Sequence, residues 1–342
     1  MNRTISVVIP TYNRNAQLSE VLDHLLTSDS DGFDDIEVIV VDDGGKESAR
    51  PTVESKNAAK PFRVVYVRQE NAGPAAARNN GFRQATNEIV LFIDDDVLVS
   101  NDLIGRHVQA HLDKPGSVIF GLYPYIKPEI ETPSFRYLDK IERDARAEVS
   151  AGADSGYVEA NIVASGNLSV EKSTFDLEKG VYDETLKTPM SEELELAIRL
   201  WSKEIPIFYV PTIDALHTQP TTIEGKCIQD YKYGYGIAEA YARLADVGPP
   251  EQFEYTMRVN GPIRHDDPLK LRIAKTAKSL LGTRVGRSIF LSFVTTVESV
   301  LPNNDKLLFS MYRKVVGVHY FAGIRDGLER FCNIDVRPGG NE

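Results

Sequence analysis

The sequence has little cysteine: Cys227 and Cys332 are the two that occur among its 342 residues. Two cysteines cannot form a disulfide framework or a four-cysteine zinc site, so we expect a protein of a reducing compartment. The N-terminus also lacks the basic region and the longer apolar stretch of a signal peptide, because Met1 is followed closely by the short apolar run 5–9. These absences predict a cytoplasmic location.

Long apolar runs are missing too. The longest mostly apolar stretch, Ile289–Val300, is well short of the roughly 20 residues that span a bilayer. The 24 glycines and 18 prolines are near ordinary usage, and the sequence has no fixed-period repeat or low-complexity tract. With 42% hydrophobic and 26% charged residues, the chain is long enough for two packed units. The composition argues against membrane-spanning, fibrous, solenoid and disordered proteins.

Positive charge is scarce over residues 1–263. Residues 264–342 hold 13 basic and 8 acidic residues, a net charge of +5, so the preceding part carries −16 of the total of −11. Such an acidic body is poorly suited to binding a nucleic-acid backbone, which relies on clustered Lys and Arg. We therefore expect no nucleic-acid partner.

The segment Pro268–Val297 has the opposite character, because it contains no acidic residue. Its basic residues, interspersed with large apolar ones, are Lys270, Arg272, Lys275, Lys278, Arg284 and Arg287. Such a stretch can lie on an anionic membrane surface, where each Lys or Arg adds about 1 kcal/mol. The alternative is a basic helical face docked on the acidic body of the same chain. We favour peripheral association with the inner face of the cell membrane.

The first third of the chain alternates strands and helices. Apolar and β-branched runs predict strands over Thr4–Pro10, Ile36–Asp42, Phe62–Arg68 and Glu88–Asp94, and helices over Ala16–Leu26 and Pro74–Ala85. This alternation predicts an α/β fold with a mostly parallel sheet covered by helices. Ligands of such sheets bind beyond the carboxyl ends of the strands.

The pattern becomes mixed beyond residue 100. It predicts strands over Ser117–Tyr125 and Ile207–Val210, helices over 134–149 and from Ser191, an irregular strand region over 156–170, and helices from Ile228 onward. We expect a catalytic domain over residues 1–225 and a helical C-terminal extension over residues 226–342, basic between 264 and 297.

Polar clusters follow three of the predicted strands. Thr11–Arg14 follows the first strand, Asp42–Gly45 the second, and Asp94–Asp96 the strand that ends near residue 93. Three adjacent carboxylates repel one another unless a cation or hydrogen-bond donors offset them, and a hard divalent metal would do so. The alternatives are an acidic, solvated turn at Asp94–Asp96 and simple turn chemistry at Asp42–Asp43.

These clusters, taken together, resemble the inverting glycosyltransferases of family 2. The motifs that carry the resemblance, in chain order, are VVIPTYNR at 7–14, VVDDG at 40–44, NAGPAAARN at 71–79, FIDDD at 92–96, SGNLS at 165–169, EELELAIRL at 192–200, and His217. The resemblance covers about residues 4–220. It implies the GT-A fold, a Rossmann-like domain with a mostly parallel sheet flanked by helices.

The resemblance also implies a nucleotide-sugar site. Asp94 is expected at the ribose of the donor, with Asp95 supporting the turn, and Asp43 at the nucleotide base. Gly73 opens an anion-binding turn at a helix N-terminus, and Arg78 either reaches the nucleotide or braces Asp94 through an ion pair. The wall facing Asp43 is formed by Pro10, Thr11, Tyr12 and Arg14.

Further roles follow from the same resemblance. Glu193 takes the position of the catalytic base, where the family commonly has Asp, and Glu192 and Asn167 are expected at the acceptor or sugar site. Asp96 and His217 are expected to ligate Mn²⁺ or Mg²⁺. Without the resemblance, Glu192 and Glu193 are explained as acidic residues that stabilise the first turn of a helix.

The implied activity is that of a metal-dependent inverting glycosyltransferase of hexosyltransferase type. It moves a sugar from a nucleotide-sugar donor, a UDP-sugar by default, to the hydroxyl of a saccharide or lipid-linked acceptor in glycan, polysaccharide or glycolipid biosynthesis. Two alternatives remain. One is a nucleotidyltransferase, which would want a basic Gly-rich loop where this chain has Thr11–Arg14. The other is a catalytically silent sugar-nucleotide-binding protein.

Overall fold

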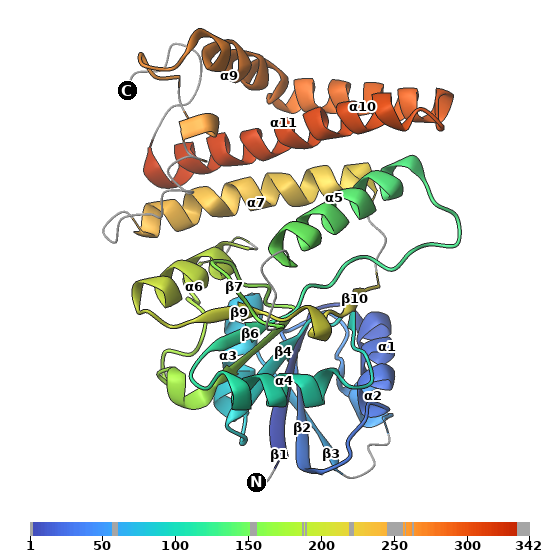
Figure 1. Ribbon diagram of the computed structural model, residues 1–342, viewed down its shortest axis with the longest axis vertical. Coiled ribbons are helices and arrows are strands. Elements are labelled where there is room, and N and C mark those ends of the chain that lie inside the picture. The colour runs from blue at the N-terminus through green and yellow to red at the C-terminus, as the bar shows by residue number, and fades with distance from the viewer. Residues whose placement is uncertain are drawn as a thin grey trace. The chain divides into compact units, whose positions relative to one another are not determined.

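The computed structural model describes residues 3–56, 61–150, 156–186, 188, 190–218, 222–244, 256, 258–261 and 263–333 (Figure 1). The chain divides into two compact units. Unit 1 comprises Met1–Ile126, Asp144–Lys187 and Leu196–Gln219, and unit 2 comprises Lys127–Arg143, Thr188–Glu195 and Pro220–Glu342. Two helices, α5 (Pro133–Ser150) and α6 (Ser191–Ser202), contribute residues to both units.

Unit 1 is built on a sheet whose described strands follow the order β3-β2-β1-β4-β8-β6-β9-β7. The strands are β1 (Arg3–Thr11), β2 (Phe33–Asp42), β3 (Phe62–Arg68), β4 (Ile89–Ile93), β6 (Val118–Phe120), β7 (Val158–Glu159), β8 (Asn167–Glu171) and β9 (Ile207–Tyr209). The first four are parallel to one another, and β9 is parallel to β6, whereas β8 is antiparallel to both β4 and β6. The mostly parallel α/β sheet predicted from the sequence is confirmed.

Helices cover both faces of this sheet. They are α1 (Asn15–Leu26), α2 (Arg50–Glu54), α3 (Pro74–Gln84) and α4 (Leu103–Asp113), with short 3-10 turns η1 (Lys172–Thr174) and η2 (Pro211–Ile213). Successive side chains of a strand point to opposite faces. Ile5, Val7 and Ile9 of β1 accordingly join one core cluster with the leucines of α1, whereas Val8 joins a second cluster with Phe82 of α3. The side chains of β1 thus contribute alternately to the hydrophobic cores on the two faces of the sheet.

A separate two-stranded ladder lies beyond the main sheet. It pairs β5 (Val97–Leu98) with β10 (Leu216–His217) in antiparallel fashion, with His217 opposite Val97. The strand predicted over 117–125 was too long, because the observed strand β6 covers only Val118–Phe120. After β6 the chain turns away from the sheet, and the backbone of Leu122 and Pro124 accepts hydrogen bonds from Ala215 and His217.

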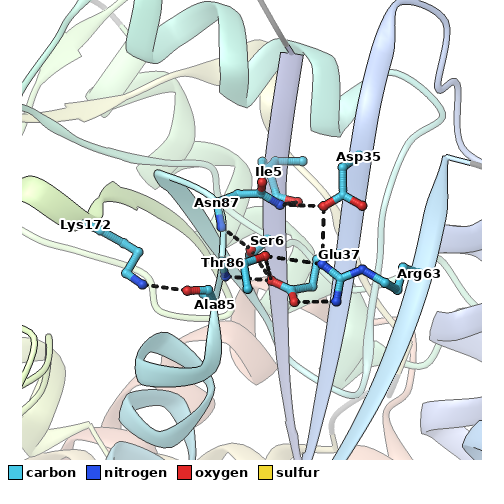
Figure 2. A network of polar contacts seen from close by, with 9 residues as sticks. All are labelled: Ile5, Ser6, Asp35, Glu37, Arg63, Ala85, Thr86, Asn87 and Lys172. Carbon is cyan, nitrogen blue, oxygen red and sulfur yellow. Dashed lines mark hydrogen bonds and ion pairs between the residues drawn. The ribbon is translucent and has the colours of Figure 1, made fainter.

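A buried carboxylate ties the connection between α3 and β4 to the sheet (Figure 2). Glu37 of β2 is 2% exposed and accepts hydrogen bonds from Ser6 Oγ at 2.6 Å and from the backbone N–H of Thr86 at 2.9 Å. Arg63 Nη1 lies 2.8 Å from its other oxygen. Burial alone would raise the pKa of Glu37, but these donors and the Arg63 cation outweigh it and hold the pKa below its ordinary value.

Unit 2 is helical. Its helices are α7 (Ile223–Leu244), α9 (Leu269–Leu281), α10 (Arg284–Val300) and α11 (Asp305–Cys332). The helical extension is confirmed, although its first helix begins at Ile223 and not near Ile228. None of the described helices is both long enough and apolar enough to cross a bilayer. The division at residue 225 stays a prediction.

Glycines allow α7 and α11 to pack closely. A Cβ at Gly323 would lie 2.0 Å from the carbonyl oxygen of Tyr231, and one at Gly234 would lie 2.3 Å from that of Tyr320. Real Cβ atoms do not approach so closely, so larger residues would push the two backbones apart. Across the same pair of helices, Tyr231 Oη donates a hydrogen bond to Asp326 at 2.8 Å.

Candidate active site

The three aspartates form the turn between β4 and β5, at the carboxyl end of the central parallel strands. Asp94 is partly exposed, and its backbone N–H donates to the carbonyl of Gly166 at 3.2 Å. A Cβ at Gly166 would lie 2.7 Å from Asp94 Oδ2, so this position needs glycine. The turn therefore rests against the SGNLS segment that leads into β8.

Asp95 points into the protein. Its carboxylate accepts a hydrogen bond from Thr11 Oγ1 at 2.7 Å and one from Arg14 Nη1 at 3.1 Å. Burial is the largest influence and raises the pKa of Asp95 to about 6, although Arg14 and Thr11 oppose the shift. These contacts tie the aspartate turn to the end of β1.

Asp96 meets two partners that come from distant parts of the sequence. Arg14 Nη1 lies 2.5 Å from its Oδ2, and His217 Nε2 lies 3.5 Å from the same oxygen. Burial would lower the pKa of Arg14, but the facing carboxylates of Asp95 and Asp96 raise it above its ordinary value. The carbonyl of Asp96 also accepts the N–H of Thr218 at 2.9 Å, which fixes the turn to β10.

The chemistry of Asp96 and His217 fits a divalent cation. Two ligands held at about 2.0–2.2 Å from one ion lie about 3 Å apart, close to the separation observed here. No group of three or more His, Cys, Asp or Glu side chains with metal-binding geometry occurs among the described residues. A metal at this pair would therefore take further ligands from substrate and water.

The His217 ring is held on two sides by aromatic residues that the sequence reasoning missed. Tyr123 stacks on it at a centroid distance of 6.2 Å, and Tyr125 meets it edge-on at 5.2 Å. The backbone of His217 also bonds to Pro124 and Ile126 at 2.9 and 3.0 Å. The available signal was a pair of tyrosines directly after a strand at the ligand-binding edge of the sheet.

Arg78 adopts the second of its two expected roles. Its side chain is 7% exposed, and Nη2 donates to Asp94 Oδ1 at 2.6 Å. The guanidinium also lies 5.5 Å from the ring centroid of Tyr182. Arg78 therefore braces the first aspartate of the turn and neutralises part of its charge.

The second acidic pair is occupied by contacts within the protein. Asp42 accepts hydrogen bonds from Tyr66 Oη at 2.7 Å and Arg68 Nη1 at 2.9 Å, as well as from two backbone N–H groups. Burial opposes ionisation of Asp42, but these donors keep its pKa below the ordinary value. Asp42 thus orders the loop after β2, as turn chemistry predicts.

Asp43 is also buried, and it holds the loop that precedes α3. Its Oδ1 accepts hydrogen bonds from Gln69 Nε2 at 2.8 Å and the Ala72 N–H at 2.9 Å, and Oδ2 accepts the Gly73 N–H at 2.9 Å. Gly73 has a φ of +95°, which favours glycine, and a Cβ there would meet nothing within 4 Å. The described residues therefore leave the approach to Gly73 open.

The rest of the expected donor wall lies at the end of β1. Pro10 is buried in the strand, whereas the ring of Tyr12 is 48% exposed just after it. Thr11 and Arg14 are committed to the aspartate turn as described above. Tyr12 is therefore the member of this wall with the largest surface free for stacking.

Asn167 is fully buried. Its Nδ2 donates to the carbonyl of Ile213 at 2.7 Å, and its Oδ1 accepts from His107 Nε2 at 2.9 Å. His107 Nδ1 in turn lies 2.8 Å from Ser169 Oγ, which His111 Nε2 also contacts. In this structure Asn167 links α4 and β8 to the segment that leads into β10, and a contact with an acceptor stays a prediction.

The two buried histidines were not recognised as part of the site from the sequence. Burial lowers the pKa of His107 to about 3 and that of His111 to about 4, so both rings are neutral at physiological pH. Since Asn167 Oδ1 accepts, His107 carries its proton on Nε2 and accepts from Ser169 on Nδ1. They lie four residues apart on α4, outside every motif that the sequence analysis used.

Glu192 and Glu193 occupy the first turn of α6, as predicted. Glu192 is buried and Glu193 is partly exposed. The negative charge of Glu193 contributes, after burial, to raising the pKa of Tyr233 in α7. Both glutamates belong to unit 2, whereas the aspartate turn belongs to unit 1.

Comparison with known proteins gives this geometry a context. Glycosyltransferase YfnE of Bacillus subtilis is 35% identical over 119 residues, which are 34% of this chain and 29% of that protein. Validoxylamine A glucosyltransferase of Streptomyces hygroscopicus subsp. jinggangensis is 38% identical over 120 residues, 34% of this chain and 28% of that protein. The chain thus spans less than a third of the length of these relatives.

The fold also has a counterpart of known structure. The mannosyltransferase PcManGT from Pyrobaculum calidifontis, solved in complex with GDP-Man and Mn²⁺, superposes with a TM-score of 0.60 at 17% identity, over 95% of this chain and 88% of that one. The sequence model of glycosyl transferase family 2 matches residues 6–154, which contain β1 to β6 and the aspartate turn. Residues 6–154 therefore match glycosyl transferase family 2, and the fold is of the GT-A type.

Proposed function

We propose that this protein transfers a sugar from a nucleotide-sugar donor to an acceptor hydroxyl, with inversion at the anomeric carbon. The observation that carries the proposal is the convergence of the aspartate turn, Arg14 and His217 at the carboxyl ends of β1 and β4. This edge of the sheet is where open α/β folds bind nucleotides. The match of residues 6–154 to glycosyl transferase family 2 supports sugar transfer as the chemistry.

The donor nucleotide would lie across the strand ends between the two acidic turns. Asp94, partly exposed and braced by Arg78, is placed to accept a hydrogen bond from a ribose hydroxyl. Asp43 holds the loop before Gly73, so the base would bind beside that loop, with Tyr12 available to stack. Uridine is our default base.

Asp96 and His217 would hold the metal, Mn²⁺ or Mg²⁺, together with diphosphate oxygens and water. When bound, such an ion would neutralise the negative charge that develops on the leaving nucleoside diphosphate. The Mn²⁺ in the PcManGT complex supports this choice of cofactor. Arg14, whose side chain is 46% exposed, compensates Asp95 and Asp96 in this structure and would turn toward the diphosphate when the donor binds.

Glu193 would remove the proton from the attacking acceptor hydroxyl. Its position in the first turn of α6 favours the ionised carboxylate, which is the form that a general base needs. Glu192 is buried beside it and would orient the acceptor or the helix start. The oxygen of the acceptor then forms its bond to the anomeric carbon on the face opposite to the departing diphosphate, which produces inversion.

The acceptor in our proposal is a saccharide or a lipid-linked sugar at the inner face of a membrane. That assignment follows from the basic apolar segment Pro268–Val297 in unit 2. Polysaccharide or glycolipid assembly is the biosynthetic setting that such an acceptor implies.

Calorimetric titration with UDP-, GDP-, dTDP- and CDP-sugars, each with and without Mn²⁺, tests the proposal. We expect one nucleotide to bind with Mn²⁺ and to be hydrolysed slowly in the absence of acceptor, with Asp96→Asn losing both. Binding without any turnover would favour a silent sugar-nucleotide-binding protein. Failure of every nucleotide sugar to bind would contradict the proposed function altogether.

A further inference from the structure

Helix α10 is apolar on two opposite sides. On its inner side, Val294 is fully buried, and Phe290, Leu291 and Val297 pack against the same core cluster, which includes Leu308 and Tyr312 of α11. Through this side, α10 packs against α11 inside unit 2. An amphipathic surface helix would be polar on the remaining side.

The outer side of α10 is not polar. Val285, Ile289, Phe293 and Val300 are each between 58% and 69% exposed, and their spacing places them along one face of the helix. Helix α9 adds exposed Leu269, Ile273 and Leu280. We call these seven residues the outer apolar row. A contiguous exposed row of large apolar side chains marks a surface that meets another apolar phase.

The six basic residues of this segment divide into two groups. Three are used inside unit 2, which the sequence did not indicate. Lys275 is 1% exposed and pairs with Asp267 at 2.6 Å, and Lys278 Nζ donates to Asn260 at 3.0 Å. Arg287 lies 4.5 Å from the ring centroid of Tyr231. These three basic side chains are structural and cannot serve a surface partner.

The other three, Lys270, Arg272 and Arg284, are exposed on α9 and at the start of α10. None of them has an ion-pair partner in the part of the chain that the structure describes. They flank the outer apolar row, and no acidic residue occurs between Pro268 and Val297. The face therefore combines an apolar row with uncompensated positive charge.

We infer that the outer apolar row of α9 and α10 is a docking surface for an anionic phospholipid bilayer. The apolar side chains enter the boundary between headgroups and acyl chains, and Lys270, Arg272 and Arg284 extend to the lipid phosphates. A second copy of the chain fits less well. A twofold interface through this face would bring the same three cations of each copy together without a compensating acid.

This inference rests on the proposed function in one respect, which is that the proposed acceptor lies at a membrane. Binding to vesicles needs neither donor nor acceptor, so it can be measured apart from catalysis. If vesicle binding fails while a nucleotide sugar is bound and hydrolysed, the docking surface is wrong and sugar transfer stands. If vesicles are bound but no nucleotide sugar is bound or hydrolysed, the proposed function is wrong and the docking surface stands.

The test is co-sedimentation of the full chain with vesicles of phosphatidylcholine alone and of equal parts phosphatidylcholine and phosphatidylglycerol. We expect binding to the anionic vesicles only, weakened by salt. The variant Lys270→Gln/Arg272→Gln/Arg284→Gln should bind on the order of 100-fold more weakly, since each cation contributes about fivefold at such a surface. The pair Ile289→Ser and Phe293→Ser should reduce binding at least about tenfold, by loss of apolar burial.

Matched controls separate the surface from general effects. Arg50→Gln/Arg106→Gln/Arg143→Gln removes the same charge from exposed positions elsewhere, and Leu112→Ser removes an apolar side chain that is 53% exposed on α4. Both should bind like the parent chain. Equal losses in the controls, or no binding of the parent chain at low salt, would overturn the inference. So would a dimer in solution that the Ile289→Ser and Phe293→Ser pair converts to monomer.

Discussion

The imidazole Nε2 of His217 lies 3.5 Å from Oδ2 of Asp96. His217 belongs to β10, where it pairs with Val97 of β5, and Asp96 directly precedes Val97 in the chain. The backbone register, and not the side chains alone, brings them together. A shift of the β5–β10 pairing by one residue would turn His217 to the opposite face of the ladder. The register therefore holds His217 beside Asp96 before any ligand binds.

We predict that Asp96→Ala abolishes metal-dependent nucleotide binding, while Asp95→Ala reduces it much less. Asp96 faces His217, whereas Asp95 is turned inward to Thr11 and Arg14. Titration calorimetry of a nucleoside diphosphate with and without Mn²⁺ measures the difference. Equal losses in the two variants would contradict the assignment of Asp96 as the ligand.

Substitution of the proposed base should separate chemistry from binding. Glu193→Gln is expected to lower turnover by roughly 10²–10⁴, the usual effect of removing a general base, with donor binding and melting temperature nearly unchanged. Glu192→Gln is the matched control and should cost far less. If both variants lose activity and stability in parallel, the two glutamates are residues of the helix start and Glu193 is not the base.

The buried carboxylate of Figure 2 should make stability depend on pH. Because the pKa of Glu37 is lower in the folded protein than its ordinary value of 4.5, ionised Glu37 stabilises the fold above that value. This contribution is lost as the pH falls through the lowered folded pKa. Glu37→Gln should therefore reduce the free energy of unfolding by about 1–3 kcal/mol at pH 7 and by little at acid pH.

Urea unfolding at a series of pH values measures the effect. Asp35→Asn is the control, because Asp35 is more exposed and also pairs with Arg63, the cation that pairs with Glu37. It should change the free energy of unfolding by less than about 1 kcal/mol. If Glu37→Gln lowers the free energy of unfolding equally at every pH, the ionisation of Glu37 does not contribute to stability.

Two glycines of α11 should respond to alanine with opposite sign. A Cβ at Gly323 would meet Tyr231 O at 2.0 Å, so Gly323→Ala should destabilise unit 2 by about 1–3 kcal/mol or more. At Gly317 a Cβ meets nothing within 4 Å, so Gly317→Ala should stabilise the helix by up to about 1 kcal/mol. Thermal unfolding checks both, and destabilisation by both would refute close α7–α11 packing as the cause.

The sequence predicted the sheet well because its strands are continuous apolar runs bounded by polar turns. The strand Phe62–Arg68 has the predicted bounds, and β1 extends the prediction by one residue at each end. The sequence-based prediction failed after β6, where the backbone of Leu122 and Pro124 leaves the main sheet and bonds to Ala215 and His217. No local pattern encodes such a distant partner.

The same distinction applies to the candidate site. Asp94–Asp96 and His217 could be identified from motifs, but the arrangement of their partners could not. The bracing of Asp94 by Arg78 and the burial of Lys275 against Asp267 each depend on tertiary contacts. The basic segment shows the limit most clearly, because charge alone could not separate the structural lysines from those on the surface.

The β5–β10 ladder also orders the events of synthesis. Asp94–Asp96 leave the ribosome early, when the chain that forms β1 to β4 is already complete, whereas Leu216 and His217 follow only after the rest of the main sheet has emerged. During that interval Arg14 and Arg78 are the cations that pair with the aspartates, since both precede them in the chain. The nascent chain thus carries internal counterions before the proposed metal site is complete, and a metal could replace Arg14 at Asp96 only once residue 217 has been added.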